Sequence, residues 1–231
     1  MDTHEQLQTM HDHWVAKLKR KGIIYDFNTA LDCAPDGIMP PHAITRQGFH
    51  SNGFVQLKLL SEDRCALAEA AHFLATRFGL LNGLMPAYVV GVGSTSETIA
   101  YLVADQLQAR PTYTEKAADK ERCTIDVPPH TPVLVVEGTI VAGTRLRRTL
   151  LELRRLELKI LQPALSIVNR SGSKYIDIGN GRPVELFSLV DLAYEEHPDS
   201  DCPLCKLGSR PYWPRRQWKI FSDAMSGVYA K

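Results

Sequence analysis

The sequence predicts an α/β protein in which a parallel β-sheet is covered by helices on both faces. Three apolar runs, at residues 87–93, 132–137 and 164–168, have the length and composition of buried strands. Each of the first two leads into a glycine-containing loop and then into a helical pattern. Because parallel strands need long crossover connections, this alternation favours a parallel sheet.

Two helices are expected before the first of these strands. One spans residues 6–21, and the other follows Ser61, which can cap it. A Pro- and Gly-rich loop at residues 33–41 and a short alternating strand at 55–59 lie between them. Apolar residues recur every three or four positions in both helices: Leu7, Met10, Trp14 and Leu18, then Leu67, Ala71, Leu74 and Phe78.

Further elements follow the same logic. A helix through Leu107 is expected to open at Ser94-Thr95-Ser96-Glu97, which has the form of a capping box. Residues 111–114 are expected as a short strand, and a helix is expected from Thr144 to about Leu161. The arginines of that last helix are interpreted mainly as a solvated face.

Composition excludes several classes of protein. The chain has 231 residues, 44% hydrophobic and 23% charged, with a net charge of +1, so nothing in its bulk charge indicates nucleic acid or membrane binding. No apolar run approaches the roughly 18 residues of a membrane span, and the polar N-terminus lacks the apolar core of a secretory signal. Five cysteines, an odd number, do not indicate a disulfide framework, so a reduced, cytoplasmic setting is expected.

The most informative segment is Val133-Leu134-Val135-Val136-Glu137-Gly138-Thr139-Ile140-Val141-Ala142-Gly143-Thr144. An acidic residue stands at the carboxyl end of a buried strand, where ligands bind in open α/β sheets. A loop of small residues then enters a helix, and backbone N–H groups at a helix N-terminus form an anion site. The plainer alternative is a tight turn after a parallel strand. No Gly-Lys-Ser/Thr follows, so this is not a P-loop.

This segment resembles the phosphoribosyl diphosphate (PRPP) motif of the type I phosphoribosyltransferases of orotate type. The resemblance implies that Glu137 contacts the ribose hydroxyls. It also implies that the 5′-phosphate is held by a loop of Thr139, Ala142, Gly143 and Thr144. Two positions depart from the family pattern: Gly138 stands where a second acid is usual, and Val141 stands where a threonine is usual.

Neighbouring segments extend the resemblance. Residues 48–58 are similar to the segment that holds the pyrimidine base, which makes Arg46 and Phe54 base-binding candidates with His50 nearby. Arg170, after the third apolar run, is the second choice for the base carboxylate. A surface turn entering a strand is the plainer interpretation of residues 48–58.

Two more segments would serve the diphosphate. Gly93, Ser94 and Thr95 occupy the place of the family's diphosphate loop, although Ser94 and Thr95 could equally be helix caps. Lys116 precedes a charged stretch, residues 117–122, that resembles the mobile catalytic loop. The resemblance makes Lys116 a catalytic candidate beside Glu137, and Lys120 a weaker one. A charge-rich loop can also be simply solvated.

The C-terminal region contains two motifs. Cys202-Pro203-Leu204-Cys205 is a possible zinc site with too few ligands in sequence, since structural zinc takes four; His197 lies close by in the chain. Arg210 to Lys219 interleaves basic and aromatic residues, which favours a packing or dimer contact over single-strand nucleic-acid binding.

The resemblance implies a type I phosphoribosyltransferase-like fold with a small hood formed by the N- and C-terminal segments. Residues 1–84 would form the N-terminal helix and base-binding segment, 85–195 the α/β core, and 196–231 a loop-rich appendage. The implied activity is Mg²⁺-dependent transfer of phosphoribose from PRPP to a pyrimidine base such as orotate, in a homodimer, with no Mg²⁺ ligands expected from the protein itself. Two alternatives remain: a catalytically degenerate homologue that binds a nucleotide or phosphate as a sensor or partner protein, and a nucleic-acid module.

Overall fold

The computed structural model describes residues 3–35, 37–81, 83–93, 96–117, 120–123, 127–179, 181 and 183–229. It divides into two compact units. The terminal unit comprises Met1–Glu62 and Ala193–Lys231, and the central unit comprises Asp63–Leu192. Both chain ends therefore contribute to one unit, and residues 63–84 belong with the α/β core rather than with the N-terminal segment.

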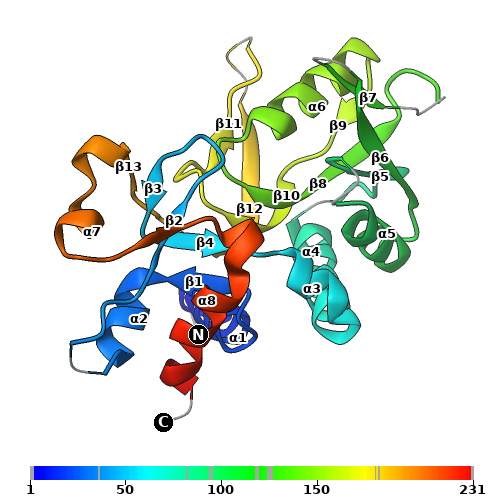
Figure 1. The fold of residues 1–231 in the computed structure, drawn as a ribbon. Coiled ribbons are helices and arrows are strands. Elements are labelled where there is room, and N and C mark those ends of the chain that lie inside the picture. Colours follow the sequence, from blue (N-terminus) through cyan, green and yellow to red (C-terminus); the bar gives the residue numbers. More distant parts are fainter. Residues whose placement is uncertain are drawn as a thin grey trace. The chain divides into compact units, whose positions relative to one another are not determined.

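The central unit is built on a mostly parallel sheet, as predicted (Figure 1). Strands run in the order β11-β12-β10-β8-β5-β6-β7, and β9 (Lys159–Ile160) pairs with the start of β8. Five adjacent strands of this sheet are parallel to one another: β12 (Val184–Asp191), β10 (Ala164–Asn169), β8 (Pro132–Ile140), β5 (Tyr88–Gly91) and β6 (Arg110–Ala117). β11 (Tyr175–Ile176) and β7 (Lys120–Cys123) are antiparallel edge strands.

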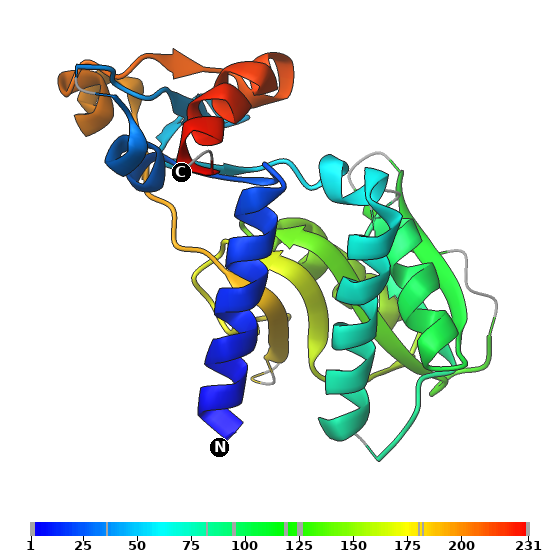
Figure 2. The ribbon, with the colours of Figure 1, turned by 90° about the horizontal axis from the view of Figure 1, so that it is seen from below.

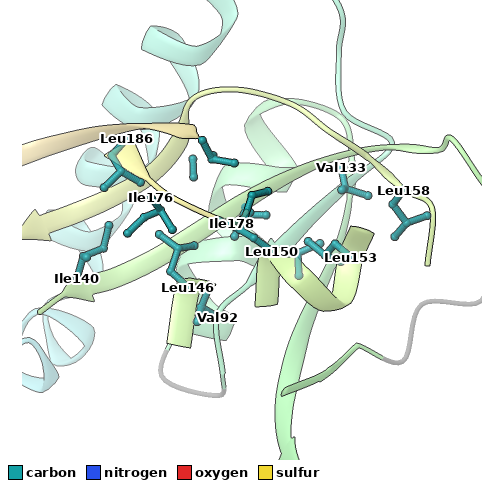
Figure 3. Close-up of a cluster of buried hydrophobic side chains, with 14 residues drawn as sticks. Val92, Val133, Ile140, Leu146, Leu150, Leu153, Leu158, Ile176, Ile178 and Leu186 are labelled. Atoms are coloured by element: carbon teal, nitrogen blue, oxygen red, sulfur yellow. The ribbon is translucent and has the colours of Figure 1, made fainter. Parts of the chain in front are cut away.

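Helices cover both faces of this sheet. α4 (Arg64–Leu81) and α5 (Glu97–Gln106) pack against each other on one face, and α6 (Thr144–Arg155) lies on the other (Figures 1 and 2). Leu146, Leu150 and Leu153 of α6 are fully buried against the sheet (Figure 3). Their spacing of three and four residues places them on one stripe of the helix, which fixes α6 to β8.

α6 ends earlier than predicted. The expected helix reached about Leu161, but the last helical residue is Arg155. Glu157 takes a left-handed backbone conformation (φ 54°), and Lys159 and Ile160 then pair with Pro132 and Val133. Leu158 and Ile160 continue the apolar pattern because they pack against the same core from a strand, which the helical period could not distinguish.

The start of α4 and the end of the strand before α3 also differ from prediction. Ser61 does not cap α4; the backbone N–H of Ala66 donates instead to Asp63 Oδ1 at 3.0 Å, and the helix begins at Arg64. The strand expected at residues 55–59 stops at Val55 as β4 (Gly53–Val55). Backbone bonds from Leu59 to Gln56 and from Leu60 to Leu57 turn the chain into α3 (Lys58–Glu62).

The charged stretch at residues 117–122 is not simply a loop. β6 continues to Ala117, three residues past the expected end, and Lys120–Cys123 returns beside it as β7. Glu115 pairs with Arg122, and Lys116 pairs with Glu121. An edge strand tolerates charged residues because its open side faces solvent. The sequence of β7 therefore shows no apolar alternation from which a strand could be predicted.

The terminal unit is assembled from short elements. From the N-terminal part come α1 (Thr3–Arg20), β1 (Ile24–Asp26), α2 (Phe27–Cys33), β2 (His42–Ile44), β3 (His50–Ser51), β4 and α3. From the C-terminal part come β13 (Glu196–His197), η2 (Asp199–Asp201), α7 (Pro203–Lys206), β14 (Pro211–Tyr212) and α8 (Pro214–Tyr229). The expectation of a loop-rich C-terminus is wrong for α8, whose 16 residues are helical apart from a kink at Gln217.

Small sheets and an aromatic core hold the terminal unit together. β1 pairs with β4, and four strands form the order β13-β3-β2-β14, in which two C-terminal strands flank two N-terminal ones. The rings of Tyr25 and Phe221 meet edge to face at 4.8 Å, and both side chains are fully buried. Among the described residues, no helix combines the length and the apolar character needed to cross a membrane.

Candidate functional site

The carboxyl ends of β5 and β8 mark a topological switch point in the central sheet. The crossover from β5 leads to β6 on one side of it, whereas the crossover from β8 leads to β10 on the other side. The direction in which successive strands are added to the sheet therefore reverses between these two adjacent parallel strands. In open α/β sheets, ligands bind in the crevice outside the strand ends at this position.

The loop after β8 is a short cradle of backbone at the start of α6. Gly143 has a φ of 66°, a left-handed conformation that favours glycine, and a Cβ added there would meet Ile176 Cδ1 at 2.5 Å. Val141, Ala142 and Thr144 are exposed. Within the described part of the chain, the backbone N–H groups of Val141, Ala142 and Gly143 donate no hydrogen bond to protein. These amides are therefore available at a helix N-terminus, where the macrodipole favours an anion.

Glu137 and Thr139 lie in β8 itself and not in the loop. The strand continues to Ile140, past its predicted end at Glu137, because Thr139 and Ile140 pair with Val168 and Asn169 of β10. Glu137 is only 9% exposed. The buried Thr139 hydroxyl has no hydrogen-bond partner among the described residues. A carboxylate and a hydroxyl thus stand two residues apart at the strand end, suited to hydroxyl groups of a ligand.

The loop after β5 is held by hydrogen bonds that were not predicted from the sequence. Gly93 has a φ of 69°, and its N–H donates to the buried Thr114 Oγ1 at 3.0 Å. Thr114 Oγ1 also lies 3.3 Å from Thr149 Oγ1 of α6. The guanidinium of Arg145 occupies the space that a side chain at Gly93 would need. Arg145, interpreted from sequence as part of a solvated face, therefore lies between the two candidate phosphate loops.

Ser96 connects the same two loops. It is the N-cap residue of α5, but its hydroxyl makes no capping bond; it accepts a hydrogen bond from Gly138 N–H at 3.1 Å. The backbone at position 138, where the family pattern has a second acid, is thereby fixed to the β5 loop. Ser94 and Thr95, the other predicted diphosphate residues, lie outside the described residues.

Arg170 lies directly beside the end of β8. It follows β10, and its backbone N–H donates to Ile140 O at 2.7 Å. Asn169 organises the following turn: its Oδ1 accepts from Ser171 N at 2.9 Å, and its Nδ2 donates to Ser173 O at 2.9 Å. Lys116 lies in β6 opposite Glu121, so its backbone is in a hairpin rather than a loop; its side chain is outside the described part.

The terminal unit brings Arg46 and Phe54 together around one cavity of about 320 Å³. The wall is completed by Ile44, Trp213, Pro214, Arg215 and Arg216. Trp213, Pro214, Arg215 and Arg216 belong to the segment predicted to form a packing or dimer contact. Nothing in the spacing of these residues indicated that they line a cavity together with Arg46. Three guanidinium groups and two aromatic rings suit a flat, anionic ligand. His50 does not line this cavity.

His50 belongs to a different cluster in the same unit. His42, His50, Cys202 and Cys205 each offer one ligand atom, and these four atoms lie within 4.8 Å of one another. Burial, then the neighbouring His50, lowers the pKa of His42 to about 4 against an opposing effect of Asp199, so its imidazole is neutral at pH 7. His197 is not in the cluster; its Nε2 lies 3.2 Å from Glu195 Oε2.

The sheet, its switch point and the two loops define a known class. The fold is shared with an orotate phosphoribosyltransferase from Aeropyrum pernix, with a TM-score of 0.56 and 19% identity over 77% of this chain and 92% of that one. It is also shared with an adenine phosphoribosyltransferase from Leishmania donovani, with a TM-score of 0.53 and 14% identity over 65% and 75%. The chain has the type I phosphoribosyltransferase fold.

Sequence similarity narrows this class. The chain is 28% identical over 190 residues to an orotate phosphoribosyltransferase from Wolinella succinogenes, covering 77% of this chain and 90% of that protein. No family model matches the sequence. The chain is thus similar in sequence to an orotate phosphoribosyltransferase and has the type I phosphoribosyltransferase fold.

Proposed function

We propose that this protein transfers phosphoribose from PRPP to a carboxylated pyrimidine such as orotate and releases diphosphate. The base nitrogen would bond to C1′ of the ribose as the bond from C1′ to the diphosphate oxygen breaks. The base gives up its N–H proton, and the diphosphate leaves with the bonding electrons. The sugar passes through an electron-poor state, so the protein's task is positioning and charge stabilisation.

The single observation that carries this proposal is the loop between β8 and α6. Its amides at Val141, Ala142 and Gly143 have no protein acceptor among the described residues, and they stand at the start of a helix at the switch point. A 5′-phosphate provides the acceptor oxygens that these donors need. Thr144, exposed at the first helical position, adds a hydroxyl donor.

Glu137 and Thr139 would orient the ribose hydroxyls beside this loop. Mg²⁺ would reach this place on the phosphates of PRPP, as expected for an ion without protein ligands, and the buried Glu137 carboxylate at the strand end would favour its charge. When bound, Mg²⁺ would neutralise charge on the diphosphate. Arg145, over Gly93, would hold the diphosphate from the side of the β5 loop.

The cavity of the terminal unit is the proposed base site. Phe54 and Trp213 offer faces for a pyrimidine ring, and Arg46, Arg215 and Arg216 offer partners for its carboxylate. A neutral purine such as adenine would leave these guanidinium groups without an anion. The composition of this wall therefore supports orotate over adenine as the acceptor.

The direct test is to incubate the protein with PRPP, Mg²⁺ and orotate, and to follow orotidine 5′-phosphate and diphosphate. Parallel reactions with uracil, adenine and hypoxanthine define the acceptor. Product with orotate alone supports the proposal. Turnover only with adenine would overturn the base assignment, and no turnover with any base would overturn the reaction.

Two departures from the family pattern favour a second candidate, a relative that binds nucleotide or phosphate without turnover. Gly138 removes one carboxylate, and Val141 places an apolar side chain, 46% exposed, where a hydroxyl would serve the phosphate. Calorimetry with PRPP, nucleoside monophosphates and phosphate separates the two functions. Tight nucleotide binding by a protein that is inactive with every base would establish the non-catalytic function.

A further inference from the structure

Two histidines and two cysteines meet inside the terminal unit, remote from each other in the chain. His42 and His50 lie on adjacent strands β2 and β3, and Cys202 and Cys205 bracket the start of α7. His42, His50 and Cys202 are at most 3% exposed, and Cys205 is partly buried. Cys202 and His42 are 160 residues apart in sequence.

Four of the six distances within this cluster are close to those of a tetrahedral ligand set, and all six are within 4.8 Å. His42 Nε2 lies 3.0 Å from His50 Nδ1, and Cys205 Sγ lies 3.3 Å from His50 Nδ1. His42 Nε2 lies 3.7 Å from Cys202 Sγ and 3.6 Å from Cys205 Sγ. A tetrahedral centre with ordinary zinc bond lengths would separate two nitrogens by about 3.3 Å and a nitrogen from a sulfur by about 3.6 Å.

Hydrogen bonds outside the cluster point the ring lone pairs into it. Ser209 Oγ donates to Pro40 O at 2.6 Å, so it accepts from His42 Nδ1–H at 2.8 Å. His50 Nε2 lies 3.3 Å from the Asp199 carboxylate, which can only accept a proton from it. In their neutral forms both rings therefore carry their proton on the outer nitrogen. The inner nitrogens, His42 Nε2 and His50 Nδ1, face each other as two acceptors with no proton between them.

We propose that His42, His50, Cys202 and Cys205 bind one Zn²⁺ ion as a closed structural site. Two sulfur and two nitrogen ligands in tetrahedral positions select zinc over the oxygen-seeking Mg²⁺ and Ca²⁺. Four protein ligands leave no open position for substrate, so the site is structural and not catalytic. Binding forms two Zn–S and two Zn–N bonds and releases the two thiol protons to solvent.

Ser209 and Asp199 complete the site as partners of the ligands. A carboxylate or hydroxyl that accepts the outer N–H fixes both the tautomer and the orientation of a metal-bound imidazole. Both partners come from the C-terminal segment, whereas both histidines come from the N-terminal one. The ion would therefore join the two halves of the unit at one point.

The site also has a consequence for the base cavity, which rests on the proposed function. Residues 45–49 form the connection between β2 and β3, and each of these strands carries one histidine ligand. Arg46 lies in that connection. Zinc would thus fix the hairpin that presents Arg46 to the base, without touching the substrate.

The test is the metal content of the purified full-length protein, measured by mass spectrometry of the elements after zinc-supplemented expression. We expect one zinc per chain, and loss of most of it in Cys205→Ser and His50→Gln. Cys65→Ser, which changes an exposed cysteine of the central unit, is the matched control and should keep its zinc. Cobalt(II) exchanged into the site should give the absorption of a tetrahedral, thiolate-bound ion.

Asp199→Asn is a milder variant, because Asp199 is exposed and is not a ligand. It should weaken zinc affinity about 10-fold or more in a chelator competition while the protein stays folded. A wild-type protein without zinc, or with a Cys202–Cys205 disulfide after purification in reductant, would overturn the proposal. So would zinc content unchanged in Cys205→Ser. None of these measurements uses PRPP or a base, so their failure and the failure of phosphoribosyl transfer are separate results.

Discussion

The two units of this protein achieve stability by different means. The central unit has long parallel strands and one continuous apolar cluster between α6 and the sheet (Figure 3). The terminal unit has strands of only two or three residues, and its interior includes the polar side chains His42, His50, Ser51 and Ser209. Short strands bury little apolar surface, so such a unit needs cross-links that a long sheet does not need. The difference teaches that a continuous apolar cluster accounts for more of the stability of the central unit, whereas specific polar contacts contribute a larger share in the terminal unit.

The largest effect is expected from Leu150→Ala in the central unit. Leu150 is fully buried, and its truncation should lower the free energy of unfolding by about 2–5 kcal/mol. All three tryptophans, Trp14, Trp213 and Trp218, lie in the terminal unit, so their fluorescence follows that unit, whereas circular dichroism follows both. Denaturant titration should shift the dichroism transition more than the fluorescence transition. Equal shifts of the dichroism and fluorescence transitions would contradict the proposed difference between the units, since the two units would then unfold together.

A smaller loss of stability, with a larger loss of ligand affinity, is expected from Gly143→Ala. The added Cβ meets Ile176 in a left-handed backbone position, which should cost about 2–4 kcal/mol and displace the phosphate loop. Gly172→Ala is the control: it has a φ of 68° but nothing within 4 Å, so it should cost only about 1–2 kcal/mol. Calorimetry should show PRPP binding lost in the first variant and kept in the second. Unchanged PRPP binding in Gly143→Ala would contradict the assignment of the loop.

Arg46→Ala tests the proposed base-binding cavity of the terminal unit. Loss of one charge-assisted hydrogen bond of about 1.5–3 kcal/mol should raise the KM for orotate roughly 10- to 100-fold, with the KM for PRPP unchanged. Arg148→Ala, an exposed arginine of α6, is the control and should leave both constants as they are. A rise in the KM for PRPP with an unchanged KM for orotate would contradict the assignment of Arg46 to the base and would indicate that it binds the phosphates.

The smallest effect is expected from Lys206→Gln. Lys206 and Asp201 form an exposed ion pair, which raises the pKa of the lysine and lowers that of the aspartate. Exposed pairs are screened by water and salt, so we expect no measurable change in the denaturant midpoint followed by tryptophan fluorescence. A clear decrease would show that the terminal unit depends on surface charge to a degree that its buried contacts do not predict.

The sequence predicted the central unit well because its patterns are local. Buried runs ending in glycine gave β5 and β8, and the order of strands and helices gave a parallel sheet. The β6–β7 hairpin was missed because edge strands carry no apolar alternation, and the end of α6 was missed because Leu158 and Ile160 pack on the same core in another conformation.

The terminal unit was harder to predict because its contacts join residues far apart in the chain. The Cys202–Cys205 pair was recognised as a possible zinc site with too few ligands, but His42 and His50 were not connected with it. Their signal was present in the sequence: two histidines flank a turn at Gly48, and a hairpin brings such residues onto one face. The wall formed by Trp213, Arg215 and Arg216 had no comparable local signal.

The discontinuous make-up of the terminal unit also sets an order for folding during synthesis. The residues of the central unit are complete once Leu192 has been made, and domains generally fold as they emerge. β2 and β3 must wait for β13 and β14, their neighbours in the finished sheet. Until those last segments leave the ribosome, the N-terminal part of the unit lacks its C-terminal neighbours, so a stalled or truncated chain would expose the aromatic surface of Tyr25 and Phe27.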